Sequence, residues 1–173
     1  KIPAVITWHE VWGKYWVEYL GYKGWFGKVI ERFIASMGSK VISVSSTTST
    51  RFRTEFNRPP DIIIPNGIDT ANPSSVSPSL LKSDLIFVGR LIKEKNARLM
   101  VHALSILISD YPDIRLIILG DGPEQDMIRS QVRNHLLERN VTIIGFLGNH
   151  DDVVALMKSS KVFILPSTRE GFG

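Results

Sequence analysis

Short apolar runs alternate with amphipathic stretches along most of this chain. Seven runs that end in small or polar residues predict buried strands, at Ala4–Trp8, Val41–Val44, Ile62–Ile64, Leu85–Val88, Ile114–Leu119, Val141–Ile144 and Val162–Leu165. Three stretches with apolar residues at three- and four-residue spacing predict helices, at Asn96–Asp110, Glu124–Glu138 and His150–Ser160. Strands that alternate with helices of about 10 to 15 residues are typical of βαβ units. The pattern therefore predicts an α/β fold with parallel sheets.

One segment interrupts this alternation. Residues 70–83 (TANPSSVSPSLLKS) are rich in Ser and Pro and have no apolar period, which predicts a linker or surface excursion. It separates residues 1–69, with about two βα units, from residues 70–173, with about four. The chain starts at Lys1 and stops inside a glycine-containing loop after a strand. We therefore expect a piece of a longer protein, cut at both ends.

Composition narrows the class of partner. Apolar residues make up 43% of the chain and charged residues 22%, the balance of an ordinary globular protein. The net charge of +4 suits an anionic ligand or membrane surface, but the basic residues are scattered, which argues against a nucleic-acid partner. There is no cysteine, which excludes disulfides and thiolate metal sites and favours a cytoplasmic setting. No uninterrupted apolar run reaches the roughly 18 residues that span a bilayer.

The strongest chemical pattern is the strand-to-helix turn GRLIKEKN at 89–96. Open α/β sheets bind ligands at the carboxyl ends of their strands, and a helix N-terminus offers free amides to anions. Arg90 can grip a phosphate with two hydrogen bonds and Lys95 adds a point charge. The alternative is a solvated basic turn in which Gly89 serves only steric needs.

Two further strand ends carry glycine-containing loops. In the GDGP turn at 120–123, Gly120 and Gly122 allow close backbone approach and Pro123 suits the first helical position. In PSTREGFG at 166–173, Glu170 could accept hydrogen bonds from sugar hydroxyls while the following amides bind oxyanions. The alternatives are a plain helix start and a surface turn.

Taken in order, these motifs resemble a known family. GR-x4-K, GDGP, a GF turn at 145–146 and PS-x2-EGFG resemble the C-terminal domain of retaining glycosyltransferase family 4. That family has the GT-B fold, in which two Rossmann-like domains face each other across a cleft. The segment PNGID at 65–69 is similar to the PNGVD signature that opens its C-terminal half. The resemblance implies that residues 1–69 end the acceptor-side domain and that 70–173 begin the nucleotide-sugar-binding domain.

The resemblance also implies roles for single residues. The Arg and Lys of GR-x4-K bind the donor diphosphate, which implicates Arg90 and Lys95. Glu170 matches the first Glu of a pair eight positions apart, which contacts the transferred sugar. The turn at 145–147 would lie near the nucleotide base, and the amides of 171–173 near sugar and phosphate. The remaining donor-binding candidates are Gly89, Gly120, Gly122, Gly145, Phe146, Leu147, Gly171, Phe172 and Gly173.

Two positions depart from the family pattern. The family usually has Gly after the Lys, whereas this chain has Asn96, which we expect to be tolerated because Asn caps helices well. The second Glu of the pair would fall at position 178, beyond the sequence, so the usual ribose contact is missing.

The N-terminal part holds one further candidate and one ambiguous segment. His9 follows a strand, and the matching family histidine lies beside the donor sugar and takes part in the active site; by itself, a His there is more often structural. Residues 11–37 combine aromatic and basic side chains, which favours peripheral membrane contact, a helical layer packed on the sheet, or the acceptor wall of the cleft. The remaining histidines have no metal-ligand spacing, and we read His102, His135 and His150 as structural.

The resemblance implies that the protein is a retaining hexosyltransferase. It would move a sugar from a UDP- or GDP-sugar to a glycan, lipid or small-molecule acceptor, in the cytoplasm or at the cytoplasmic face of a membrane. The donor is a substrate, and no metal or other cofactor is expected because Arg90 and Lys95 take the role of a metal. We expect the chain by itself to be inactive. The alternatives are another GT-B enzyme, such as a sugar-nucleotide epimerase, and a non-catalytic sugar-nucleotide-binding protein.

Overall fold

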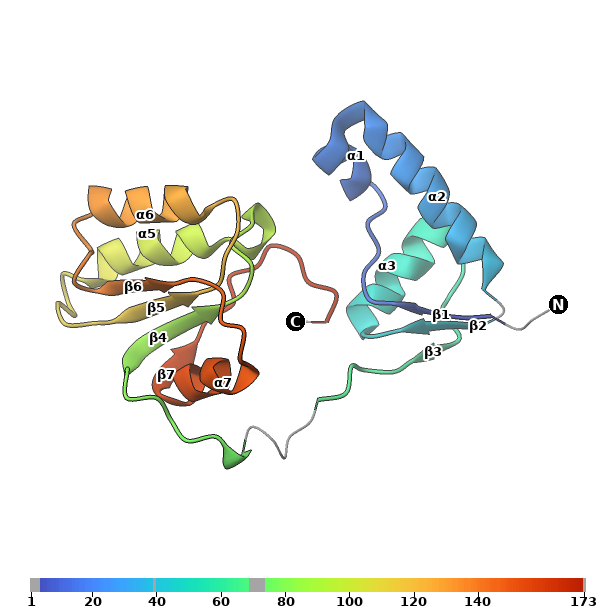
Figure 1. The fold of residues 1–173 in the computed structure, drawn as a ribbon. Helices are drawn as coiled ribbons and strands as arrows, with labels where there is room; N and C mark the ends of the chain where they lie inside the picture. Colours follow the sequence, from blue (N-terminus) through green and yellow to red (C-terminus); the bar gives the residue numbers. More distant parts are fainter. Residues whose placement is uncertain (1–3, 39, 69–73, 173) are drawn as a thin grey trace. The chain divides into compact units, whose positions relative to one another are not determined.

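The chain folds into two compact α/β units (Figure 1). The computed structural model describes residues 4–38, 40–68 and 74–172. The first unit contains residues 1–68 together with the tetrapeptide Glu170–Gly173, and the second contains Asp69–Arg169.

The first unit is a three-stranded parallel sheet with helices on one face. Its strands are β1 (Val5–Trp8), β2 (Lys40–Ser43) and β3 (Ile62–Ile63), in the order β1-β2-β3. Its helices are α1 (Tyr15–Leu20), the 3-10 helix η1 (Gly21–Lys23), α2 (Gly24–Met37) and α3 (Ser46–Phe56). Ala35 of α2 and Phe52 of α3 pack with Trp8 and Val41 of the sheet in one buried cluster. Burial of these apolar side chains joins both helices to the sheet.

Helices α1 and α2 form a tight hairpin because two glycines face α1. A Cβ on Gly24 would overlap the carbonyl of Trp16, and one on Gly27 would overlap the Trp16 ring. The sequence left residues 11–37 as a membrane segment, a helical layer or the wall of an acceptor site. They contain α1, η1 and α2, and α2 packs on the sheet through Ala35. In the described part of the chain, no helix is long and apolar enough to cross a membrane.

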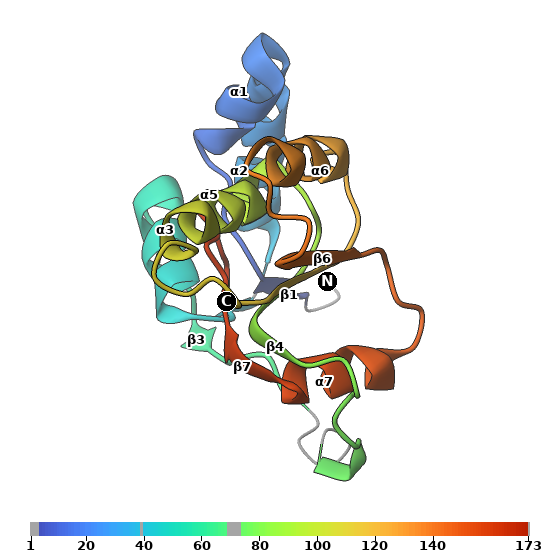
Figure 2. The ribbon, with the colours of Figure 1, turned by 90° about the vertical axis from the view of Figure 1, so that its left-hand side faces the viewer.

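The second unit is a four-stranded parallel sheet between two helical layers. Its elements are β4 (Ser83–Val88), the 3-10 helix η2 (Lys93–Lys95), α5 (Ala97–Leu107), β5 (Leu116–Leu119), α6 (Gln125–Asn134), β6 (Val141–Ile144), α7 (His150–Lys158) and β7 (Ser160–Phe163). The strand order is β6-β5-β4-β7. Phe87 and Ile118 face α5 and α6, whereas Ile86 and Ile117 face α7. Figures 1 and 2 show these helices on opposite faces of the sheet, so β5 is buried on both sides.

The parallel α/β architecture predicted from the sequence is confirmed, with shifted boundaries. The strand expected at Ile114–Leu119 begins at Leu116, and the one expected at Val162–Leu165 lies at Ser160–Phe163. The expectation that every strand is buried is wrong for β1, β3 and β7, where Val5 is 62%, Ile62 52% and Val162 50% exposed. All three are edge strands of their sheets among the described residues, so one side lacks a neighbouring strand.

The expected linker at 70–83 holds only in part. Residues 70–73 lie outside the described residues, and Ser83 already belongs to β4. The hydroxyls of Ser83 and Ser160 lie 2.8 Å apart across β4 and β7, which accounts for a polar residue at the buried start of a strand.

Candidate functional site

The glycine turns after β4 and β5 are in direct backbone contact. The Gly89 N–H donates to the carbonyl of Leu119 at 3.0 Å, and the Gly120 N–H donates to that of Ile144 at 2.9 Å. Gly120 has a φ of +140°, and a Cβ there would overlap the Gly89 carbonyl oxygen. The hydrogen-bond ladder of the sheet therefore continues past the strands and sets both turns at one edge.

Leu91 joins the first turn to the second. Its N–H donates to the Asp121 carbonyl at 2.8 Å, and its carbonyl accepts from the Glu124 N–H at 3.0 Å. Gly122 has a φ of +155°, and a Cβ there would lie 2.5 Å from the Leu91 carbonyl oxygen. The glycines of the GDGP turn are thus required by backbone packing. Pro123 is not the first helical residue, because α6 begins at Gln125.

The two candidate cations come from the connection between β4 and α5. Arg90 is exposed at the end of the strand, and Lys95, half-buried, ends η2. The Lys95 N–H donates to the Ile92 carbonyl at 3.0 Å, which closes this short helix. Arg90 and Lys95 therefore both lie on the connection that follows the carboxyl end of β4.

Asn96 follows η2 in the left-handed conformation, with a φ of +54°. Its side chain makes no capping hydrogen bond to α5, so the capping role expected from the sequence is wrong. Asn is the residue other than Gly that adopts this conformation most readily. Backbone conformation, and not capping, therefore explains why Asn96 can stand where the family usually has Gly.

The loop after β7 is fastened to η2. Both the N–H and the hydroxyl of Thr168 donate to the Glu94 carbonyl, at 2.9 and 3.3 Å. Thr168 is therefore held next to Glu94, the residue that precedes Lys95. Three sequence-distant loops, after β4, β5 and β7, meet at one edge of the second unit.

The turn after β6 lies at the same edge but is looser. A Cβ on Gly145 would meet nothing within 4 Å, and Phe146 is 80% exposed. Leu147, by contrast, packs against the cluster that contains Leu119. The exposed Phe146 ring offers a flat apolar surface of the kind on which a base can stack.

In the first unit, His9 follows β1 and lies against the C-terminal tetrapeptide. A Cβ on Gly171 would overlap the His9 carbonyl oxygen. The Gly171 carbonyl accepts from the hydroxyls of Ser45 and Thr48 at 2.6 and 2.8 Å, and Arg51 donates to the Glu170 carbonyl at 3.4 Å. The unit thus brings the backbones of candidate residues His9, Glu170 and Gly171 together.

The sequence missed the hydroxyls that hold this tetrapeptide. Ser45 is the N-cap of α3, where its oxygen accepts from the Thr48 N–H, and Thr48 is buried. A serine before a Thr- and Ser-rich stretch is a recognisable helix start that could have predicted α3. Phe172 is half exposed, and Gly173 lies outside the described residues.

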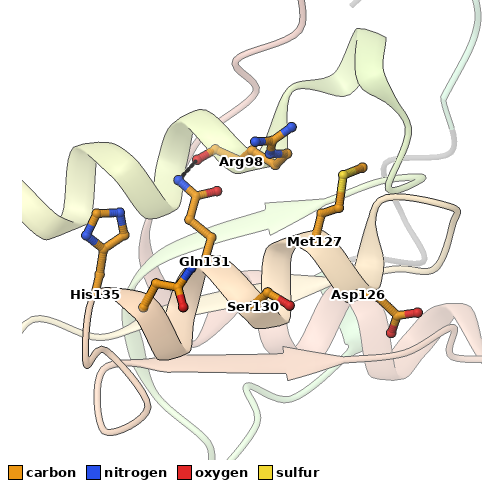
Figure 3. Close-up of a pocket in the computed structure, with 7 residues that line it drawn as sticks. Arg98, Asp126, Met127, Ser130, Gln131 and His135 are labelled. Atoms are coloured by element: carbon orange, nitrogen blue, oxygen red, sulfur yellow. Dashed lines mark hydrogen bonds between the residues drawn. The ribbon is translucent and has the colours of Figure 1, made fainter.

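The hollow drawn in Figure 3 lies apart from these residues. It sits on α5 and α6 and is lined by Arg98, Asp126, Met127, Ser130, Gln131, Asn134 and His135. The Gln131 side chain crosses it to donate to the Arg98 carbonyl at 3.2 Å (Figure 3). It contains no candidate residue and does not lie at the carboxyl ends of the strands. Within the described residues, no group of His, Asp or Glu side chains could hold a metal ion.

Comparison with known proteins gives the class. Residues 76–173 match the family described as glycosyl transferases group 1, and residues 1–72 match Glycosyltransferase Family 4. The chain belongs to the group 1 glycosyltransferases. Solved structures with this fold are GT-B glycosyltransferases, which confirms the GT-B class.

Three known proteins illustrate how similar the chain is to its relatives. The gpi3 subunit of phosphatidylinositol N-acetylglucosaminyltransferase from Schizosaccharomyces pombe is 28% identical over 148 residues, 82% of this chain and 32% of the relative. Glycogen synthase of Mycobacterium tuberculosis is 35% identical over 113 residues, 64% of this chain and 27% of the relative. The crystal structure of Anabaena HepE in complex with UDP is 24% identical, with a TM-score of 0.77 over 99% of this chain and 49% of HepE. The chain spans a third or less of the length of the two curated relatives, the gpi3 subunit and the glycogen synthase.

Proposed function

We propose that the parent protein, of which this chain forms part, is a retaining glycosyltransferase. It moves a hexose-type sugar from a nucleoside diphosphate sugar, with uridine or guanosine as the base, to a glycan, lipid or small-molecule acceptor. The observation that carries this proposal is the meeting of three loops at one sheet edge, with two cations on the first of them. The named relatives support it, since they include an N-acetylglucosaminyltransferase and a glycogen synthase, and HepE was crystallised with UDP.

The donor diphosphate would bind to Arg90 and Lys95. Arg90 is exposed and ready to form two parallel hydrogen bonds with phosphate oxygens, and Lys95 supplies a second positive charge. The backbone of Gly89, Gly120 and Gly122 would allow the phosphates to approach the strand ends. These two cations would do the work that a metal ion does elsewhere, so no metal is required.

The sugar and the base would lie on either side of the diphosphate. Glu170 would accept hydrogen bonds from sugar hydroxyls, with His9 beside the same sugar and the amides of 171–173 against sugar and phosphate. The turn of Gly145, Phe146 and Leu147 would lie by the base. The acceptor would bind to the first unit.

The reaction would proceed on one face of the sugar. The bond between the anomeric carbon and the diphosphate oxygen breaks while the acceptor hydroxyl oxygen bonds to the same carbon from the same face. The acceptor proton passes to the leaving diphosphate, so the balance needs no protein nucleophile. Arg90 and Lys95 stabilise the charge that grows on the leaving group, which is the most productive form of electrostatic catalysis.

Substitution of the cations tests the proposal. In the parent protein, Arg90→Ala and Lys95→Ala should each lower kcat/KM for sugar transfer by about 10² to 10³. The double variant should lower kcat/KM by less than the product of the two single-variant factors, because both side chains serve one diphosphate. Lys93→Ala is the matched control, since Lys93 is an exposed lysine of the same short helix. An Arg90→Ala enzyme within about threefold of wild type would remove Arg90 from the site.

The products of the reaction separate the other candidate functions. A transferase releases nucleoside diphosphate only as the acceptor is glycosylated. A sugar-nucleotide epimerase would change the sugar of the donor with no acceptor present. A non-catalytic binding protein would bind the donor, with loss of binding in the Arg90→Ala variant, and would turn nothing over.

The proposal includes peripheral membrane contact through residues 11–37. The support is a set of exposed apolar side chains on η1 and α2, which include Tyr22, Trp25, Phe26 and Phe33, beside Lys23. Aromatic rings and lysines together suit the interface of an anionic bilayer. Tyr22→Ser should reduce co-sedimentation of the parent protein with anionic phospholipid vesicles, whereas Tyr111→Ser, at an exposed tyrosine of the second unit, should not. Equal sedimentation of both variants with wild type would argue against this contact.

A further inference from the structure

Glu31 is a buried carboxylate that binds a loop instead of a cation. It lies in α2 and is only 6% exposed. Its Oε1 accepts from the Trp12 N–H at 2.7 Å, and its Oε2 accepts from the Gly13 N–H at 2.8 Å and from the indole Nε1 of Trp16 at 3.2 Å. Three hydrogen bonds thus satisfy a side chain whose burial would otherwise be costly.

The bound amides belong to the connection between β1 and α1, which carries His9. One end of this connection is held by Trp8, whose ring packs against Phe52 at 5.2 Å between centroids. Val11 is buried in the same cluster. The other end is held by Glu31 through two consecutive amides. The backbone is therefore fixed on both sides of the exposed His9.

Gly13 gives the connection its shape. It has a φ of +51°, and a Cβ there would lie 2.6 Å from Oε2 of Glu55. The N–H groups just before this bend, those of Trp12 and Gly13, both donate to the Glu31 carboxylate, and successive N–H groups that converge on one anion are a recurrent anion-binding arrangement. A carboxylate suits it because each oxygen can accept from one amide.

An amide side chain cannot replace the carboxylate. With Gln at position 31, one side-chain oxygen could accept from one N–H, but the NH2 group would face the other donor. One backbone N–H would then be buried without an acceptor, which is the expensive way to lose a hydrogen bond. Position 31 therefore requires two hydrogen-bond acceptors, and a side chain of the same size with only one acceptor does not suffice.

We infer that Glu31 is a positioning residue for His9: by binding the amides of Trp12 and Gly13, it holds the loop that presents the histidine to the donor sugar. The inference rests on the proposed function for the role of His9. The hydrogen bonds from Glu31 to the loop can be tested without it. Small displacements of a reacting group lower rates steeply, so the hold on the backbone is expected to matter for transfer.

The first test measures the loop directly. Glu31→Gln in the parent protein should speed amide hydrogen exchange in residues 9–16 by about tenfold or more, while exchange in β4 and β5 stays unchanged. Glu18→Gln is the matched control, because Glu18 is an exposed glutamate of the neighbouring helix α1. Unchanged exchange at 9–16 in Glu31→Gln would overturn the inference, whatever the activity of the protein.

The second test separates positioning from general stability. Glu31→Gln should lower kcat for sugar transfer by about 10- to 100-fold in the wild-type background. In a His9→Ala background it should lower kcat by less than about threefold, because the group that it positions is already gone. Equal losses in both backgrounds would show a purely structural role and overturn the inference. If His9→Ala alone leaves transfer unchanged, the proposed role of His9 fails, and the exchange result still decides the hydrogen bonds of Glu31.

A milder variant covers the case in which Glu31→Gln does not fold. Trp16→Phe removes one of the three hydrogen bonds and keeps the aromatic ring. It should produce a smaller increase in exchange at residues 9–16 and a smaller loss of kcat. No increase in exchange would again count against the inference.

Discussion

A Cβ atom on Gly120 would overlap the carbonyl oxygen of Gly89, the first residue of the proposed diphosphate turn. Gly120 also has a φ of +140°, which disfavours any side chain. Gly120→Ala should therefore destabilise the protein by about 3 kcal/mol, from steric overlap and backbone strain together. Chemical denaturation of the variant measures this loss.

Gly145→Ala is the matched control for that measurement. Gly145 directly follows β6, and a Cβ there would meet nothing within 4 Å. The unfolding free energy of Gly145→Ala should stay within about 0.5 kcal/mol of wild type. If both alanine variants are equally stable, the close contact between Gly89 and Gly120 is not a constraint on the fold.

Asn96 should be replaceable by Gly but not by Ala. Its φ of +54° costs an ordinary residue about 1 to 2 kcal/mol, and Gly nothing. Thermal unfolding should show Asn96→Gly as stable as wild type or more so, and Asn96→Ala less stable by about 1 kcal/mol. Asn134→Ala, at an exposed residue of α6, should not destabilise. A loss for Asn96→Gly as large as that for Asn96→Ala would point to the side chain and not the backbone.

Asp84 makes the second unit sensitive to acid. A hydrogen bond from Lys161, at 2.7 Å, and one from the Arg115 N–H hold the pKa of Asp84 below its ordinary value of 3.8. Because the folded pKa is lowered, its stabilisation is complete above the unfolded pKa and is lost as pH falls through the folded pKa. Asp84→Asn should cost about 1 kcal/mol or less at pH 7, since the pair is partly exposed.

The difference in unfolding free energy between Asp84→Asn and wild type should shrink as pH falls below about 4. Unfolding curves at pH 7 and at lower pH values measure it. Asp113→Asn, at an exposed turn of the same unit, controls for the general effect of removing a carboxylate. A cost that does not change with pH would show that the ion pair and amide hydrogen bond of Asp84 do not act through its charge.

Glu170 should recognise sugar more than nucleotide. A carboxylate accepts hydrogen bonds from hydroxyls but repels phosphate oxygens, and in the proposed site the diphosphate would already have two cations, Arg90 and Lys95. Calorimetry on the parent protein should show that Glu170→Ala weakens binding of the nucleotide sugar by about 1 to 3 kcal/mol while binding of the nucleoside diphosphate changes little. Glu170→Gln should be milder. Equal weakening of both ligands would assign the residue to the nucleotide or to loop shape.

The sequence was informative where the signal is local. Short apolar runs predict the strands that end just before Gly89, Gly120 and Gly145. Because the sheet is parallel, the turns that follow these strands lie at the same edge. Helix α3 was missed because its Ser- and Thr-rich residues favour helix weakly, so only the cap Ser45 announces it.

Contacts between distant segments could not be predicted. Glu31 is the one acidic residue in the apolar sequence of α2, which marks it as unusual, but its amide partners lie 18 and 19 residues earlier. The conformation of Asn96 was misjudged because a capping residue and a left-handed residue favour the same amino acid for different reasons.

The double hydrogen bonding of Leu91 bears on how this family can diversify. Because both its N–H and its carbonyl are bonded to the turn after β5, inserting or deleting a residue in either turn would break the bond pattern of the other. The turn after β6 has no such tie at Gly145 or Gly148, where added atoms would meet open space. Changes in loop length should therefore accumulate after β6, while the turns after β4 and β5, which Leu91 joins, keep their lengths.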